Sequence, residues 1–197
     1  MTKTAGRPPR SKIETREFRD KVSRHAMALY REAGFDAVSM RRLSKAVGCA
    51  PTTLYAHFDG KTEILMLLWA DVLAEMLAHV HESLESQTEP AERLKAAALA
   101  FVAYWTDHPD HFRLVFMSNH VGRADVDSFV ETGNVQDSFQ MFAKLVQDVD
   151  PARDDLTVRT DSLIAGMIGV ALCSITVRQY SWPSASAMTC QLIENVI

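Results

Sequence analysis

The polar side chains best suited to chemistry lie together in one short stretch, residues 50–61, with the sequence APTTLYAHFDGK. If this stretch forms a helix, Leu54 and Phe58 lie four residues apart on one face. The remaining faces then carry hydroxyl, phenol and imidazole groups with no core to enter, those of Thr52, Thr53, Tyr55 and His57. These groups form hydrogen bonds, so the pattern raises the question of what they bind.

Catalytic chemistry has no positive signal in the sequence. Serine, histidine and aspartate are scattered, without a nucleophile elbow, a glycine-rich phosphate loop or an HExxH pair. We therefore predict that the protein is not an enzyme and uses no cofactor. The alternative is an enzyme or carrier domain, which a cleft with convergent titratable groups around His111 or His120 would indicate.

The histidines and cysteines that could bind a metal or undergo redox chemistry also have simpler explanations. His108 and His111, with Asp107 and Asp110, have a spacing that a metal could use, but no further ligand follows, and hydrogen bonding at a helix end explains them. We predict no metal site. The three cysteines, Cys49, Cys173 and Cys190, are odd in number and widely spaced, which indicates reduced thiols. A redox role is conceivable only for Cys49.

Composition and charge divide the chain. Its 197 residues suffice for one good core, or for a small domain joined to a larger one. Residues 1–61 carry 13 Lys and Arg against 6 Asp and Glu, whereas the remainder carries 8 against 19. The split indicates that the first part meets a polyanion, although a basic tail that aids solubility is the alternative. No membrane span or secretory signal is evident, so we expect a cytoplasmic protein.

The elements that must position the polar stretch are short helices. Apolar residues recur every three or four positions over 16–33, and Gly34 ends the pattern. Ser39 has the chemistry of a helix N-cap and Gly48 that of a helix end. A third helix begins near Pro51, where the missing amide proton costs nothing. Two short helices separated by about three residues form the layout of a helix-turn-helix.

Further helices are expected along the rest of the chain, and no stretch alternates as a strand does. A long helix begins at Lys61, and the others are expected at about residues 88–108, 109–117, 124–148 and 154–181 and from 184 onward. The fold class is therefore all-α, with an N-terminal three-helix helix-turn-helix domain and a C-terminal helical domain.

The segment FDAVSMRRLSKAVGCAPTTLYAHFDGKTEIL, preceded by HAMALYREAG, resembles the DNA-binding domain of the tetracycline-repressor (TetR) family of bacterial transcription regulators. The resemblance covers roughly residues 16–69. It departs from many members at Thr52 and Ala56, and at Ala50, where a capping serine is frequent. The segment HPDHFRLVF, residues 108–116, is similar to a sequence near the ligand domain of many members.

The resemblance implies roles for the polar stretch. Short polar side chains on the first turn of a recognition helix approach base edges in the major groove, which suits Thr52 and Thr53. Tyr55 and His57 would reach phosphates, as would Lys61 at the start of the long helix. The predicted interface with operator DNA is completed by the helix start and the preceding helix, namely Pro51, Ser39 and Arg41. A minor-groove arm would carry Arg7 and Arg10.

The resemblance also implies the organisation of the chain: an arm over residues 1–15, a DNA-binding domain over 16–61 and a regulatory domain over 62–197. The regulatory domain would pair through its last two helices to form a homodimer, for which a buried helix of a monomer is the alternative. Its interface is predicted at Gly169, Leu172, Ile175, Leu192 and Val196. A small-molecule effector would enter a cavity lined by Phe101, Tyr104, Trp105, Phe116, Phe139, Phe142 and Met167.

These observations predict a repressor that a small, largely apolar effector releases from a palindromic operator. Two alternatives stay open. One is an activator, or a regulator controlled by a partner protein without a small ligand. The other is a DNA-binding head fused to an enzymatic or carrier domain.

Overall fold

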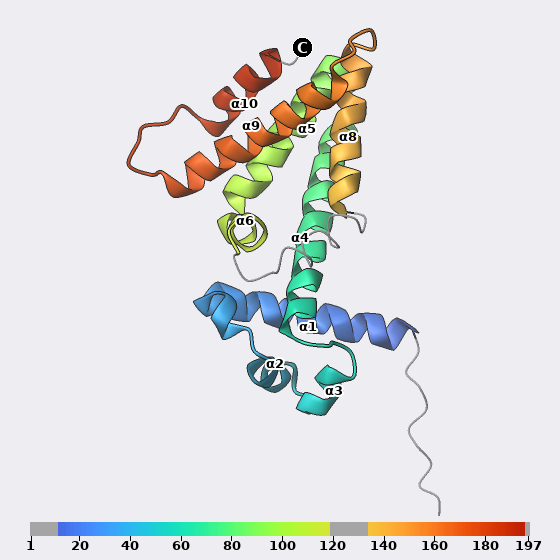
Figure 1. The fold of residues 1–197 in the computed structure, drawn as a ribbon, viewed down its shortest axis with the longest axis vertical. Coiled ribbons are helices and arrows are strands. Elements are labelled where there is room, and N and C mark those ends of the chain that lie inside the picture. Colours follow the sequence, from blue (N-terminus) through green and yellow to red (C-terminus); the bar gives the residue numbers. More distant parts are fainter. Residues whose placement is uncertain (1–11, 119–133, 196–197) are drawn as a thin grey trace, which may run out of the picture. The chain divides into compact units, whose positions relative to one another are not determined.

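The computed structural model describes residues 12–118 and 134–195, and in these ranges the chain forms helices and no strand (Figure 1). The all-α fold class is confirmed. In chain order the helices are α1 (Lys12–Ala33), the 3-10 helix η1 (Phe35–Ala37), α2 (Met40–Val47), α3 (Pro51–Tyr55), α4 (Lys61–Leu84), α5 (Pro90–Asp107), α6 (Pro109–Phe116), α8 (Asn134–Val149), α9 (Leu156–Thr176) and α10 (Ala185–Glu194).

The helices form two compact units, Met1–Leu68 and Trp69–Ile197, and the continuous helix α4 contributes to both. In the first unit, α2 contacts both α1 and α3 (Figure 1). The core of this unit is built from apolar residues that the helical pattern places inside, including Val22, Ala26, Leu43, Leu54 and Phe58. A small helix-turn-helix unit thus has a core of its own.

The second unit is organised around α5, which contacts α6, α8, α9 and α10. Its largest fully buried side chains include Trp105, Phe112 and Phe142. The indole N–H of Trp69 donates to the carbonyl oxygen of Leu114 over 2.9 Å, which fixes the end of α6 against α4. Large aromatic side chains therefore fill the interior of this unit, because each of them buries an extensive apolar surface.

Several helix boundaries differ from those expected. Helix α1 begins at Lys12, four residues before the predicted start, and Glu14 in its first turn interacts favourably with the helix dipole. Helix α9 ends at Thr176 instead of Ser181, because the indole N–H of Trp182 donates to the carbonyl oxygen of Val177 and folds the following segment back. The helix predicted at 124–148 is described only from Asn134 onward.

Two helices, α4 and α9, are long and apolar enough to cross a membrane by length and composition alone. Core helices pass the same test, so this is weak evidence for a membrane span. In α4 the apolar stripe is buried within the protein at Ile64, Leu68, Val72 and Met76. Burial of this stripe accounts for the composition of the helix without a membrane.

Candidate nucleic-acid interface and regulatory unit

The ends of α2 are set by the two residues that the sequence marks for this purpose. The Ser39 hydroxyl accepts a hydrogen bond from the backbone N–H of Arg42 at 3.3 Å and caps the helix. Gly48 adopts a left-handed conformation with φ of 75°, which glycine tolerates at no steric cost. Its N–H donates to the Ser44 carbonyl at 3.0 Å, so α2 stops and the chain turns into α3.

Helix α3 has only five residues, and its polar face is left open. Pro51 occupies the first turn, and Ala50 provides no side-chain cap. Leu54 and the following Phe58 are buried, which anchors one face as predicted. Thr52 is exposed, Thr53 is half-buried, and Tyr55 is 57% exposed. The hydroxyl groups are thus presented outward by the two apolar anchors.

The two arginines of α2 behave differently. Arg42 forms an ion pair with Glu32 at 3.3 Å, so its guanidinium is held against α1. Arg41 is exposed, and none of the residues that the structure describes pairs with it. Its donor fork is free to contact a phosphate or a guanine edge.

His57 and Lys61 are half-buried, and each lies against an aromatic ring. The His57 ring lies 4.7 Å from the Phe18 ring, between centroids. The Lys61 ammonium lies 3.5 Å from the centroid of the Phe35 ring, a cation–π contact. Burial lowers the pKa of Lys61, and the nearby Asp36 carboxylate acts in the opposite direction. Phe35 therefore holds Lys61 at the N-terminus of α4. The predicted arm residues Arg7 and Arg10 lie outside the described residues.

The residues predicted to line an effector cavity are mostly packed against one another. Five of the seven are buried, and only Phe116 and Phe139 are exposed. Trp105 has no exposed surface and makes edge contacts with several aromatic rings, those of Phe101, Tyr104, Phe112 and Phe116. Its indole N–H is buried and has no hydrogen-bond partner in the part of the chain that the structure describes. This cluster is the interior of the second unit.

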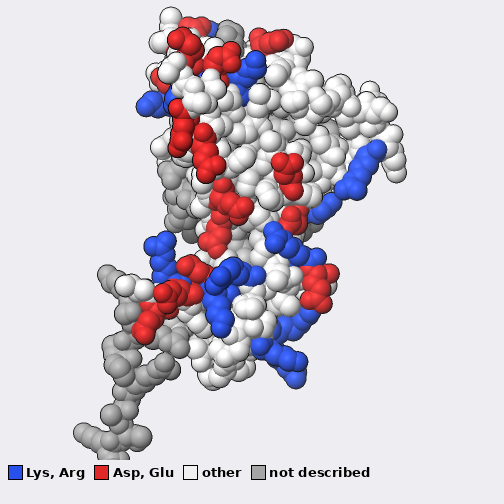
Figure 2. All heavy atoms as spheres, turned by 180° about the vertical axis from the view of Figure 1, so that it is seen from behind, with Lys and Arg blue, Asp and Glu red and all other residues white. Residues whose placement is uncertain are grey.

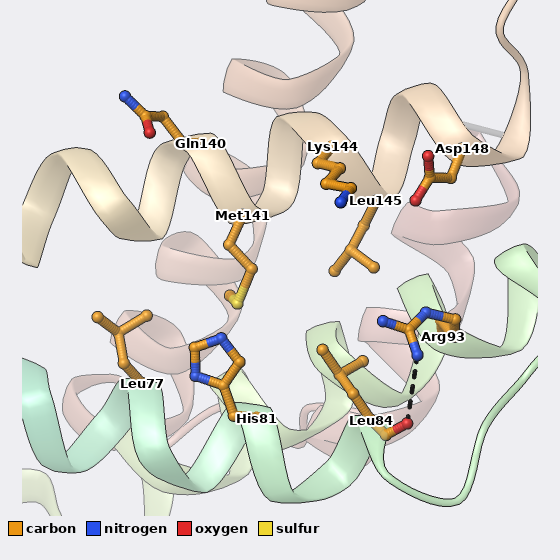
Figure 3. A pocket seen from close by; sticks show the side chains of 9 residues that line it. All are labelled: Leu77, His81, Leu84, Arg93, Gln140, Met141, Lys144, Leu145 and Asp148. Carbon is orange, nitrogen blue, oxygen red and sulfur yellow. Dashed lines mark hydrogen bonds between the residues drawn. The ribbon is translucent and has the colours of Figure 1, made fainter.

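A pocket of about 520 Å³ lies elsewhere in the same unit, between α4, α5 and α8 (Figure 3). None of the seven predicted residues lines it. Figure 3 shows Met141 and Leu145 of α8 directed toward Leu77, His81 and Leu84 of α4. The walls are completed by polar side chains from α5 and α8, namely Arg93, Gln140, Lys144 and Asp148. The pocket is therefore apolar within and polar at its edges.

Of the two histidines around Pro109, His111 forms a hydrogen bond in the interior, and the His108 ring stacks on its ring. His111 is buried, and its Nδ1 lies 2.8 Å from the Tyr104 hydroxyl, which itself lies 3.3 Å from the Val72 carbonyl oxygen. Its Nε2 lies 3.8 Å from a carboxylate oxygen of Asp110. Within the described ranges, no three His, Cys, Asp or Glu side chains converge as metal ligands would. These contacts give His111 a structural role in joining α6 to α5.

The residues predicted for a dimer interface fall into three groups. Gly169 and Leu172 lie on the outer side of α9, where Leu172 is exposed and a Cβ on Gly169 would meet nothing within 4 Å. Ile175 is buried inside the subunit. Leu192 of α10 packs on α9, since a Cβ on Gly166 would lie only 2.9 Å from its Cδ1. The fifth, Val196, lies outside the described residues.

The surface charge follows the division of the sequence. On the face drawn in Figure 2, acidic side chains run along the unit of residues 69–197, and Lys and Arg side chains are denser on the helix-turn-helix unit. A basic helix-turn-helix surface suits a polyanion.

A three-helix unit whose third helix has an open polar face, joined through α4 to a larger helical unit, defines a helix-turn-helix protein with a second, helical part. Residues 24–66 match the family model described as bacterial regulatory proteins, tetR family. The helix-turn-helix part of the chain is therefore a DNA-binding domain of the TetR-family type, as the resemblance of its sequence predicts.

Curated relatives and solved structures agree with this assignment. The chain is 24% identical over 106 residues to the HTH-type transcriptional activator FasR of Mycolicibacterium smegmatis, covering 54% of this chain and 48% of the relative. It is 23% identical over 133 residues to the repressor KstR2 of the same organism, covering 66% and 63%. The chain thus spans less than two thirds of the length of these relatives.

The structural likeness extends over nearly the whole chain. A tetR-family regulatory protein from Rhodococcus RHA1 aligns over 95% of this chain and 96% of its own, with a TM-score of 0.66 and 13% identity. A Rhodococcus sp. RHA1 protein of unknown function aligns over 91% and 92%, with a TM-score of 0.75 and 18% identity. At these identities the likeness concerns the fold.

Proposed function

We propose that the protein binds a palindromic DNA operator as a homodimer and represses transcription in the bacterial cytoplasm. The observation that carries this proposal is the open polar face of α3, which presents Thr52, Thr53 and Tyr55 while Leu54 and Phe58 hold the opposite face. Exposed Arg41 adds a donor fork from the neighbouring helix. Residues 16–61 serve as the DNA-binding domain, 62–197 as the regulatory domain and 1–15 as a basic arm.

Whether the bound protein represses or activates transcription depends on where the operator lies, and repression is expected where the operator overlaps a promoter. Of the two curated relatives named above, FasR carries the name of an activator and KstR2 that of a repressor. Activation is therefore the second candidate. A reporter assay with and without the protein distinguishes the two, since a repressor lowers expression and an activator raises it.

The outer face of α9 supports pairing of two subunits. This face carries small or apolar side chains, among them Val158, Ala165, Gly169 and Leu172, at intervals that place them along one side of the helix. Small residues allow two helices to approach closely. A second copy of the same helix across a twofold axis would cover this face in both subunits.

The dimer is tested together with the DNA target. Selection of bound duplexes from a random library should yield two inverted half-sites about 10 base pairs, or a multiple of that, apart. Gly169→Glu should leave the subunit folded, because its Cβ has space, but should break the dimer and remove the requirement for two half-sites. Sedimentation at micromolar concentration measures the first effect, with Ala78→Glu at an exposed position of α4 as a control that adds the same charge outside the proposed interface. An intact Gly169→Glu dimer would contradict the interface.

The effector site is proposed at the pocket between α4, α5 and α8, in place of the aromatic cluster. Its volume of about 520 Å³ is in the range of small-molecule sites, and leucine and methionine side chains form much of its wall. Lys144 and Arg93 at its edge supply donors for an acceptor group of the ligand. A small, largely apolar molecule with a hydrogen-bond acceptor at one end fits this lining.

A ligand here would contact α4, which runs without interruption from Lys61 to Leu84. Binding that favours one position of α4 would favour one spacing of the two recognition helices in the dimer. To empty the operator, the effector must bind the released conformer more tightly by several kcal/mol, about 5.5 kcal/mol for a complete switch.

Filling the pocket tests this assignment. Met141→Trp should place a larger apolar ring in the pocket. It should abolish the thermal stabilisation that compounds from a small-molecule screen give the wild-type protein, and these compounds should no longer release the variant from the operator. Operator affinity without ligand should change less than about threefold, because Met141 is only half-buried and lies in α8, outside the helix-turn-helix unit. The conservative variant Met141→Leu should keep the ligand response. Unaltered ligand stabilisation in Met141→Trp would exclude the pocket.

A further inference from the structure

Arg19 of α1 connects three parts of the segment that follows the recognition helix. Its Nη1 donates to the backbone carbonyl oxygen of His57 at 3.2 Å and to Oε1 of Glu63 at 3.2 Å, and its Nη2 reaches the same Oε1 at 3.3 Å. The centre of the guanidinium lies 4.6 Å from the centroid of the Phe58 ring. One side chain therefore touches the backbone just beyond α3, the buried Phe58 that follows α3, and the first turn of α4.

Glu63 completes this connection. While its Oε1 accepts from Arg19, its Oε2 accepts from the backbone N–H of Asp59 at 2.8 Å. The carboxylate thus caps the turn between α3 and α4 at the same time as it holds the guanidinium. Both side chains are about one third exposed, at 34% and 36%, so the ion pair by itself adds little stability. Its effect lies in the geometry that it imposes.

Helix α3 depends on such contacts for its direction. A helix of five residues is far too short to be stable alone in water, so tertiary contacts fix it. At its start, Ala50 offers no side-chain cap. At its other end, α1 reaches the chain leaving α3 through the polar contacts of Arg19 with the His57 carbonyl and the Phe58 ring, and through the Phe18 ring, which lies against the His57 ring.

We propose that Arg19, held by Glu63, is a positioning residue that sets the angle at which α3 presents its threonines to DNA. This inference rests on the proposed function and adds a determinant of sequence discrimination. Loss of the tether lets α3 tilt by small amounts, which weakens contacts with base edges more than contacts with phosphates. Base contacts require closer geometry, since phosphates are recognised through flexible and water-mediated contacts as well.

The test compares Arg19→Ala with Arg24→Ala in the full-length dimer. Arg24 is an exposed arginine of the same helix, so both variants lose one positive charge. Binding to the selected operator and to a random duplex is measured at three salt concentrations. Arg19→Ala should weaken operator binding about tenfold, equivalent to about 1.4 kcal/mol, and random-duplex binding less than about twofold. Arg24→Ala should leave the ratio of the two affinities unchanged.

Two further variants separate positioning from other roles. Glu63→Gln should reproduce much of the loss in discrimination although it alters no positive charge, and Arg19→Lys should restore part of it. Amide exchange at Phe58 and Asp59, measured without DNA, should accelerate in Arg19→Ala and Glu63→Gln. The slope of log affinity against log salt should stay constant, because no phosphate contact is lost.

Each other outcome overturns the inference in a recognisable way. Equal loss on both duplexes, with a slope reduced by about one, means that Arg19 contacts a phosphate directly. A lower melting temperature with unchanged discrimination means that Arg19 only stabilises the unit. If the wild-type protein prefers the operator over the random duplex and Arg19→Ala keeps this preference, only the positioning role is overturned. If the wild-type protein shows no preference among duplexes, the proposed function is overturned as well.

Discussion

Trp105→Ala is expected to lower the free energy of unfolding of the unit Trp69–Ile197 by about 3–5 kcal/mol, the range for removal of a buried large aromatic ring. The side chain has no exposed surface and contacts four aromatic rings, so the cavity left behind has no simple way to collapse. Urea unfolding of the protein measures the loss. Operator binding and effector response should fall together, because both depend on a folded unit.

Trp105→Phe is the matched control. It keeps an aromatic ring but removes the indole N–H, which is buried without a partner among the described residues. An unsatisfied buried donor destabilises the folded state by about 1–3 kcal/mol, so its removal offsets much of the free-energy cost of the small cavity that phenylalanine leaves. The free energy of unfolding should therefore change by about 1 kcal/mol or less. If Trp105→Ala remained stable while only the effector response changed, Trp105 would line a ligand site, and our placement of the effector beside Met141 would be wrong.

The helix-turn-helix could be predicted closely because its signals are local. Ser39, Gly48 and Pro51 act on the backbone within a few residues of their own positions, through a cap, a left-handed turn and a missing amide. The end of α9 was predicted less well. Its position depends on the contact between Trp182 and Val177, in which the chain folds back on itself, and helical periodicity contains no sign of that contact.

Among the candidate sites, too, those that depend on local sequence could be predicted and those that depend on distant contacts could not. The open polar face of α3 follows from two apolar residues four positions apart, so sequence alone identifies it. The tether from Arg19 to Glu63 joins residues 44 positions apart, and the contact of Lys61 with Phe35 likewise requires the folded unit. No local pattern distinguishes these side chains from ordinary surface charges.

The residues predicted to line an effector cavity differ from those that line the pocket proposed above. Aromatic side chains suit the lining of a ligand site, but they are also common in a plain core, and in this unit most of them bury their surface by packing on one another. The pocket instead lies where α4 and α8 present leucine, methionine and polar side chains at intervals of three and four, at Leu77, His81 and Leu84 and at Met141, Lys144, Leu145 and Asp148. This amphipathic pattern is the signal that could have located it.

The second large effect is expected in α3 itself, where Thr53→Ala should weaken operator binding by about 1–3 kcal/mol and relax the preference at one or two operator positions. Thr53 is half-buried beside the anchored face, so its hydroxyl and methyl occupy a fixed place from which to meet a base edge. Its backbone N–H already donates to the Ala50 carbonyl at 3.0 Å, and alanine keeps that bond. The helix should therefore remain folded.

Lys61→Ala provides the contrast, because a phosphate contact and a base contact fail differently. Loss of one phosphate contact should lower affinity for operator and random duplex alike and reduce the salt slope by about one unit. The contact of Lys61 with Phe35 raises a competing possibility, since a lysine that only braces the Phe35 ring would leave the slope unchanged. Lys61→Arg separates these cases, because it keeps a cation for phosphate. Unchanged discrimination in Thr53→Ala, or an unchanged slope in Lys61→Ala, would show that α3 and the start of α4 do not divide base recognition from phosphate binding in this way.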